Sequence, residues 1–430
     1  GWESFGEYLD AIDTPYALDI GTQAPHVAIR HYVMGERCYG NATREDMEKM
    51  RDVTREALKA GALGFSTSRF YGHVDKAGNV VPGTEASAEE MCVIGEAFQG
   101  LGHGTIEIIS DHLEDDDELA WIEQIIRSTE RPVTVLTTPK LSKIWPMAEK
   151  LASENLYLRP QVGARPASIL MTLDGTVNPM RQHMAYREIQ NESLADRQAA
   201  LKDPEFRRRV LSEETRQPRN RDAARFMNNY EEIYVMDASL TYEPSQEDSI
   251  ARRASAAGVL PLEIIMDVMA EGTPLLVFFS GYPDNLEAQR VIIENPHSVF
   301  GLSDGGAHCG VLVDASVPTY MLSYFCRDRE RGPTISLPLV VHKMTQDTAK
   351  TYGLLDRGVV AEGYRADLNI IDFKSLKLHQ PEMVYDLPAE GKRLIQRSEG
   401  YRYTMCAGEV TYQDGNHTGA MPGRLLRGGK

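Results

Sequence analysis

The fold is decided by the stretch TREDMEKMRDVTREALKAGALGFSTS, residues 43–68. Its first part carries Thr43 with Asp46 three places on, apolar side chains at helical spacing and Gly61 at its end, which predicts a capped amphipathic helix. The following ALGFSTS is short, starts apolar and ends in small polar residues, as a buried strand does when it reaches a functional edge. One helix followed by one buried strand is the repeating unit of α/β folds.

The same unit recurs along the chain. Its further copies are SAEEMCVIGEAFQGLG into TIEIIS, EDDDELAWIEQIIRSTE into VTVLTT, KLSKIWPMAEKLASEN into LYLRPQV, PLEIIMDVMAEG into PLLVFFSG, and NLEAQRVIIENP into SVFGLSD. Together with YALDIGTQAPH near the start, they predict about seven parallel strands, either in a doubly wound sheet or in a barrel, where the count is one or two short of eight. Whether LYLRPQV is a barrel strand or part of a following insertion stays open.

Two regions break the rhythm. The polar residues between the units define an insertion, or lid, at about 163–258, because long loops in compact domains are usually functional or mobile. From residue 354 to residue 430 the pattern changes to period-two alternation with Gly and Asp-Gly turns, as in GVVAEGYRADLNIIDF and YRYTMCAGEVTYQDGNHTG. We therefore predict a barrel or sheet domain over 1–353 and a small antiparallel β unit over 354–430.

Composition narrows the class of protein. The chain of 430 residues has a net charge of −17, which disfavours nucleic acid as a partner. Its longest apolar runs, such as PLLVFF, fall far short of the roughly 20 residues that a membrane helix needs. The five cysteines form no CxxC pair, which is typical of a reducing compartment and indicates the cytoplasm. A homo-oligomer is compatible with this composition.

Candidate catalytic residues come from the ends of the predicted strands, because active sites of parallel α/β folds lie at the carboxyl edge of the sheet. VFGLSDGGAHCG, residues 299–310, ends a strand with Asp304 and follows it with glycines and His308. An aspartate at this position can bind a metal or take a proton from water, although it can also cap a helix. His308 contacts either substrate or its own loop.

Four further residues are candidates for the same edge. Arg69 follows GFSTS and is suited to clamp a substrate carboxylate, or else to form an ion pair at the mouth of the sheet. Ser66 and Tyr282 lie at other strand ends and are candidate substrate contacts. His112 precedes LEDDDE, whose acids favour the start of a helix. The stretches GxGxxG after a first strand, GxxxxGK[ST], HExxH and GxSxG are absent, which argues against a dehydrogenase, a kinase and an α/β-hydrolase.

Several motifs together resemble one known family. GVVAEGYRADLNIIDF and GLSDGGAH, with GALGFSTSRF, IISDHLEDDDELAW and AGEVTYQDG, are similar in order and over nearly the whole length to the N-acyl-D-amino-acid deacylases of the amidohydrolase superfamily. The resemblance implies a (β/α)8 TIM-type barrel with a C-terminal β-sandwich portion. It also implies zinc-dependent hydrolysis of a linear amide in small N-acyl-D-amino acids. Asp304 matches the aspartate that binds metal and acts as general acid and base in that family.

The sequence departs from the family pattern in two ways. It contains no His-x-His motif, from which we expect a chain that lacks its first one or two barrel strands and with them most of the zinc ligands. Two later strands that end in metal-binding histidines in the family end here in IIS and LTT, and His112 is only a nearby substitute. The alternatives are therefore a cyclic-amide hydrolase of the hydantoinase type, or a non-catalytic barrel that has lost its metal site.

Overall fold

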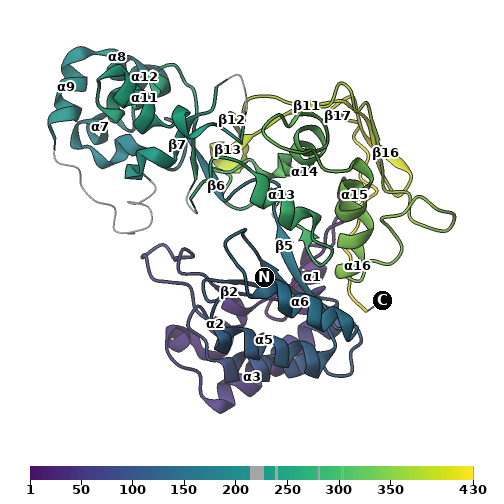
Figure 1. Cartoon of the computed structure of the whole chain (residues 1–430). Helices are drawn as coiled ribbons and strands as arrows, with labels where there is room; N and C mark the ends of the chain where they lie inside the picture. Colours follow the sequence, from purple (N-terminus) through teal and green to yellow (C-terminus); the bar gives the residue numbers. More distant parts are fainter. Residues whose placement is uncertain (214–226, 238–240, 279–280, 302, 304, 430) are drawn as a thin grey trace.

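A computed structural model describes residues 1–213, 227–237, 241–278, 281–301, 303 and 305–429. Its central element is a sheet of six parallel strands in the order β1-β2-β3-β4-β5-β9. Figure 1 labels β2 and β5 of this sheet. The strands are β1 (Ala24–Pro25), β2 (Gly64–Arg69), β3 (Thr105–Ser110), β4 (Val133–Leu136), β5 (Leu158–Val162) and β9 (Val299–Phe300). LYLRPQV is thus a strand of the main sheet, and the predicted parallel α/β core is confirmed.

Helices from the predicted repeats cover one face of this sheet. They are α3 (Arg44–Ala60), α4 (Ala88–Gly95), α5 (Asp116–Thr129) and α6 (Ile144–Ser153). The helices α1 (Phe5–Ala11) and α2 (His26–Met34), which the repeats did not predict, precede them. The Thr43 hydroxyl accepts a hydrogen bond from the Asp46 amide, and the Asp46 carboxylate accepts one from the Thr43 amide, so the predicted capping box starts α3. Met50 and Leu58 of α3 are fully buried in the core cluster that also holds the apolar residues of β2 to β4.

The insertion forms a separate lobe of helices in the described residues, at the upper left of Figure 1. The lobe contains α7 (Met184–Ile189), α8 (Leu194–Lys202), α9 (Pro204–Ser212) and α11 (Ile250–Ala257). It also contains α12 (Pro261–Ala270), which the repeats predict as a helix of the main sheet and which lies beyond the predicted end of the insertion at 258. The apolar faces of these helices share a third core cluster with the strands that lead into and out of the lobe. These strands are β6 (Ser168–Met171), β7 (Ile233–Val235) and β8 (Leu275–Phe278).

The expectation that PLLVFF adds a parallel strand to the main sheet is wrong. This run forms β8, which pairs antiparallel with β6 on one side and with β7 on the other. All four residues of β8 are buried. A continuous apolar run indicates that both faces of a strand are buried, but it does not show whether the strand pairs parallel or antiparallel. Direction is set here by β6, which is a partner more than 100 residues earlier in the chain.

The chain returns from the lobe through α13 (Glu287–Glu294) and β9 to a helical stretch. That stretch holds α14 (Val317–Tyr320), a π-helix (Met321–Asp328), α15 (Leu337–His342), a second π-helix (Lys343–Asp347) and α16 (Thr348–Thr351). After it the predicted antiparallel pairing is confirmed: a four-stranded sheet has the order β10-β15-β16-β17, and β11 pairs with β14 and β12 with β13. These strands are β10 (Leu368–Ile371), β11 (Lys377–Leu378), β12 (Glu382–Leu387), β13 (Gly391–Ile395), β14 (Ser398–Glu399), β15 (Tyr401–Cys406), β16 (Glu409–Gln413) and β17 (Asn416–His417).

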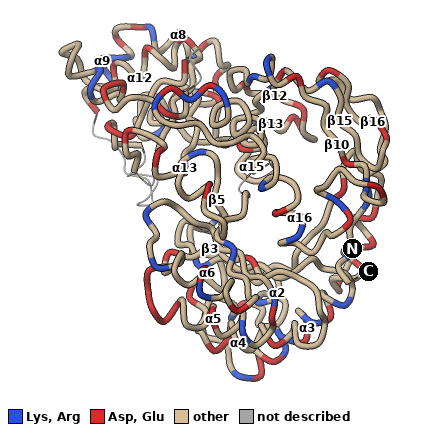
Figure 2. The backbone as a smooth tube through the Cα atoms, turned by 45° about the vertical axis from the view of Figure 1, so that its right-hand side comes forward, with Lys and Arg blue, Asp and Glu red and all other residues tan. Residues whose placement is uncertain are grey.

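The two ends of the chain lie side by side (Figure 2). Tyr16 pairs with Gly423, and Ile20 with Leu425, in two isolated β-bridges. The last residues therefore rest on the N-terminal segment rather than on the C-terminal strands. None of the helices in the described part of the chain has the length and apolar character to cross a membrane.

Candidate active site

Polar side chains line one face of the parallel sheet. Because side chains alternate between the faces of a strand, the register places one set of residues on the face away from α3 to α5. This polar face consists of Ser66, Ser68, Glu107, Thr134, Arg159 and Gln161. Ser66, one of the predicted substrate contacts, is therefore on the polar face in the middle of β2, beside Glu107 of β3.

A tyrosine joins the polar residues of three strands. The Tyr352 hydroxyl donates to Glu107 Oε2 at 3.1 Å and accepts from Gln161 Nε2 at 3.2 Å. The same amide nitrogen of Gln161 donates to Thr134 Oγ1 at 2.9 Å. Burial and the neighbouring Glu107 carboxylate raise the pKa of Tyr352, so its proton stays in place. The network therefore connects polar side chains of β3, β4 and β5 through hydrogen bonds.

After β9, the described residues 305–311 form a loop, which we call the site loop. His308 has φ of 55°, and its carbonyl accepts hydrogen bonds from the amides of Val311 and Leu312. A histidine in the left-handed region is uncommon and is maintained here by the tight turn. Asp304, the predicted general base and metal ligand, lies outside the described residues, and its roles stay predictions.

His308 lies close to a second histidine, His73, which belongs to the loop after β2. Its ring lies nearly parallel to that of His73, with 6.4 Å between the centroids. Ser68, at the end of β2, holds His73 through a hydrogen bond of 2.7 Å between Oγ and Nδ1. Three strands separate β2 from β9, which would place them roughly 19 Å apart in a flat sheet. His73 lies four residues beyond β2 and His308 eight residues beyond β9, so the loops after these two strands bring the rings together.

Arg69 lies at the predicted edge but is engaged by the protein itself. Its Nε donates to Glu118 Oε1 at 2.8 Å, and its Nη1 donates to the Ala86 carbonyl at 2.5 Å. Glu118 in turn accepts from Ser110 and Trp121, so the side chain of Arg69 belongs to a buried polar cluster behind the strand ends. This geometry corresponds to the ion-pair alternative, and a role as substrate clamp stays a prediction.

His112 and the described residues around it do not form a metal site. Its Nδ1 contacts Asp115 Oδ2 at 3.2 Å, and its ring meets Tyr71 edge-on at 5.8 Å. Within residues 1–213, 227–237, 241–278, 281–301, 303 and 305–429, no group of three His, Cys, Asp or Glu side chains is arranged to hold a metal ion. The described residues thus do not fit the zinc centre that the resemblance implies, and no reaction step proposed below passes through a metal.

Tyr282 is buried in the core cluster that also holds Phe300 and Val313. Its hydroxyl donates to the Pro244 carbonyl at 2.8 Å, and its ring stacks on Phe278 with 4.5 Å between centroids. Only 4% of the residue is exposed. Tyr282 therefore contributes to the second core cluster, and its proposed contact with substrate would require this packing to open.

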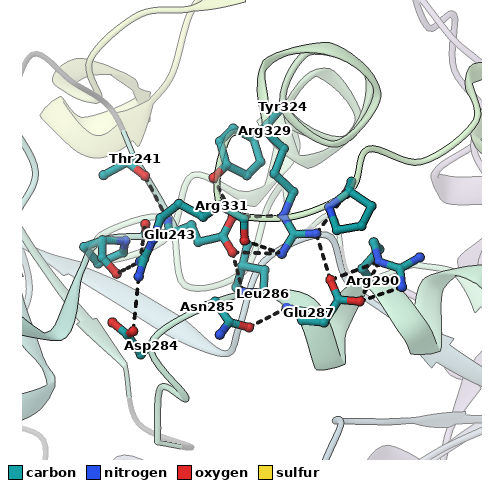
Figure 3. A network of polar contacts seen from close by, with 12 residues as sticks. Thr241, Glu243, Asp284, Asn285, Leu286, Glu287, Arg290, Tyr324, Arg329 and Arg331 are labelled. Carbon is teal, nitrogen blue, oxygen red and sulfur yellow. Dashed lines mark hydrogen bonds and ion pairs between the residues drawn. The ribbon is translucent and has the colours of Figure 1, made fainter.

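A buried network of charged groups lies next to Tyr282 (Figure 3). Glu243 accepts from Arg329 Nε and Nη2 at 3.1 and 3.0 Å, from the Tyr324 hydroxyl and from the Leu286 amide. Burial alone would raise the pKa of Glu243, but the hydrogen bonds from Arg329 and Tyr324 outweigh it and lower the pKa. Neither Glu243 nor Arg329 exposes its side chain, so the network joins the end of the insertion to α13 and to the first π-helix.

Local sequence patterns point only weakly to the residues that form these contacts. His73 follows the strand end SRF by only a few residues, so a search of the loops beyond strand ends would have found it. Arg165, three residues past β5, places one guanidinium nitrogen 2.7 Å from Asp314 Oδ1 and stacks over the ring of Tyr242. Glu243 and Arg329 lie 86 residues apart, and no local pattern connects them.

Comparison with known proteins identifies the family. The sequence profile of the amidohydrolase family matches residues 1–412. The chain belongs to the amidohydrolase family. Membership confirms the predicted enzyme class, a hydrolase acting on carbon–nitrogen bonds other than peptide bonds.

Curated relatives and solved structures agree with this family. A D-aminoacylase of Alcaligenes xylosoxydans xylosoxydans is 25% identical over 99% of this chain and 74% of its own length. An N-acyl-D-aspartate deacylase from the same organism is 24% identical over 99% of this chain and 72% of its own. A crystal structure of D-aminoacylase covers 99% of this chain and 75% of its own with a TM-score of 0.57 and 20% identity. An N-acyl-D-glutamate deacylase from Bordetella bronchiseptica, complexed with zinc and a phosphonate inhibitor, has a TM-score of 0.56 and 16% identity over the same shares.

Proposed function

We propose that this amidohydrolase cleaves the amide bond of N-acyl-D-amino acids and releases a carboxylic acid and a free D-amino acid. The observation that carries the proposal is the similarity of 99% of the chain to D-aminoacylase and to N-acyl-D-aspartate deacylase. The polar face of the sheet and the site loop supply a setting for such a reaction at the edge where α/β enzymes bind substrate. The inferred architecture is a barrel of the (β/α)8 type, which the likeness to D-aminoacylase structures supports.

In the proposed reaction Asp304 takes a proton from the attacking water and passes it to the nitrogen of the leaving amine. The water oxygen forms the new bond to the acyl carbon, and the carbon–nitrogen bond breaks. His308 and Ser66 are the proposed contacts to the substrate. The solved relatives include a protein with a binuclear metal centre and one complexed with zinc. We infer a divalent metal for this chain too, with ligands beyond the described residues, and zinc stays the predicted ion.

The test uses the purified protein with N-acetyl-D-amino acids that carry apolar, aspartate or glutamate side chains. We expect release of a primary amine from at least one D-substrate and none from its L-enantiomer. Asp304→Asn should reduce kcat by about 10³-fold or more, since loss of a general acid–base group costs about that much. Turnover of hydantoin rings in place of acyl amino acids would favour a cyclic-amide hydrolase.

A non-catalytic binding barrel is the second candidate. It rests on the strand ends, where β3 finishes in Ser110, which is bonded to Glu118, and β4 is followed by Thr137. Metal analysis after expression in zinc-replete medium separates the two candidates. Bound zinc near one ion per chain together with amine release supports the enzyme, whereas a metal-free protein without turnover supports the binding barrel.

A further inference from the structure

The site loop is held at three points by two other segments. The Leu170 amide of β6 donates to the Val311 carbonyl at 2.8 Å, and the Thr176 amide donates to the Gly310 carbonyl at 3.2 Å. From the other side, the Leu394 amide of β13 donates to the Cys309 carbonyl at 2.6 Å. The loop therefore takes its position from the start of the insertion and from the hairpin formed by β12 and β13.

One carboxylate links these two holding segments to each other. Asp174 lies in the turn after β6, between Leu170 and Thr176, and is only 7% exposed. It accepts from the Tyr385 hydroxyl of β12 and from Lys392 Nζ of β13, the latter at 3.3 Å. The turn and the hairpin are thus joined directly as well as through the site loop.

The same carboxylate also reaches the helical lobe. Arg197 Nη2 of α8 donates to Asp174 Oδ1 at 2.8 Å, and the second terminal nitrogen of Arg197 donates to the Leu173 carbonyl at 2.7 Å. Arg197 is itself buried, so removing the charge of Asp174 would leave its guanidinium inside the protein without an acid partner among the described residues. A contact of this kind fixes geometry more firmly than a neutral hydrogen bond.

We propose that Asp174 is a positioning residue for the site loop, which couples the helical lobe and the C-terminal hairpin to the place where catalysis occurs. The inference rests on the proposed function in one respect. The site loop directly follows Asp304, the proposed general base, and carries His308, a proposed substrate contact. Asp174 makes no contact with the site loop side chains in the described structure. Its effect passes through the turn at residues 172–176 and through β13.

The experiment is hydrogen–deuterium exchange of the full chain, read at the amides of Leu170, Thr176 and Leu394. We expect Asp174→Asn to accelerate exchange at these amides about tenfold, because the variant weakens a local closed state rather than the whole fold. Tyr385→Phe removes one donor from an exposed side chain and should give the same pattern in a weaker form. Asp267→Asn is the matched control, since Asp267 also pairs with an arginine of the lobe but is exposed and remote from the loop.

Kinetics provide the second readout. With an active substrate, Asp174→Asn should lower kcat/KM about tenfold or more, because the site loop carries His308, a proposed substrate contact, and directly follows Asp304, the proposed general base. Unchanged exchange at the three amides in Asp174→Asn would overturn the proposal. So would acceleration spread evenly over α8 and α12, which indicates general unfolding of the lobe. Exchange needs no substrate, so a failure of the proposed enzymatic activity would be seen separately.

Discussion

At the scale of single residues, the buried ion pair of Glu243 and Arg329 is a site where the loss of one partner should destabilise the fold. Both side chains are fully buried, and each charge needs the other because the interior solvates neither. Arg329 keeps a second acid, Glu287, at 3.2 Å. Among the described residues Arg329 is the one cation bonded to the Glu243 carboxylate, while Arg331 donates only to the backbone carbonyl of Glu243. The two halves of the pair are therefore unequal, and Arg329 is the half that tolerates loss of its partner better.

Glu243→Gln is expected to lower the free energy of unfolding by about 3 kcal/mol, near the lower end for breaking a buried ion pair, because Glu287 still faces Arg329. Thermal and urea unfolding of the two proteins measure the difference. Glu271→Gln serves as the control, since its pair with Lys202 is exposed on the lobe and should be worth less than about 1 kcal/mol. Equal effects of the two substitutions would contradict a special role for the buried pair.

At the scale of elements, α3 shows what sequence reasoning reaches. The residues that form its cap, its apolar stripe and its end at Gly61 all lie within a stretch of 20 positions, and all three features are present in the structure. The direction of β8 and the burial of Tyr282 depend on partners more than 30 residues away, β6 and Pro244. The role of Asp174 depends on Tyr385, 211 residues later. Local chemistry therefore predicts the elements, but not the distant contacts that hold the site loop.

The cap of α3 also makes a prediction for acid stability. Hydrogen bonds from Arg37 lower the pKa of Asp46 to about 2, and those from Thr43 act in the same direction, from an ordinary value of 3.8. A carboxyl with a depressed folded pKa stabilises the protein above its unfolded pKa, and this contribution disappears as the pH falls from about 4 to about 2.

We expect Asp46→Asn to reduce Tm at pH 7, with the difference from the parent protein shrinking as the pH falls below about 4. Thermal unfolding followed by circular dichroism between pH 7 and pH 3 measures both slopes. Asp52→Asn is the comparison on the same helix, because Asp52 is exposed and contacts only its neighbour Arg51 among the described ion pairs. A constant gap between Asp46→Asn and the parent across this range would refute the linkage.

At the scale of the whole molecule, the chain is closed by contacts between its two ends. Asp19 is buried and accepts from Arg357 and Arg365, which lead into the C-terminal strands, and from the Arg424 amide in the last segment. Backbone hydrogen bonds from Ile20 to Arg424 and from Leu426 to Ile20 continue the contact. Asp19 thus joins the N-terminal segment, the entry to the C-terminal strands and the C-terminal tail at one point.

Asp19→Asn should therefore loosen the tail without unfolding the core. Trypsin cleaves after arginine, and Arg424 and Arg427 lie within the contact, so release of the C-terminal peptide reports its opening. We expect the cleavage rate to rise about tenfold, as it would if the closed state lost about 1.4 kcal/mol, while the core melts within a few degrees of the parent protein. Asp386→Asn, which breaks an exposed pair with Arg393, is the matched control and should leave the rate unchanged. If Asp19→Asn also leaves it unchanged, the tail is held by its backbone contacts alone, and the ends of the chain are not coupled through this carboxylate.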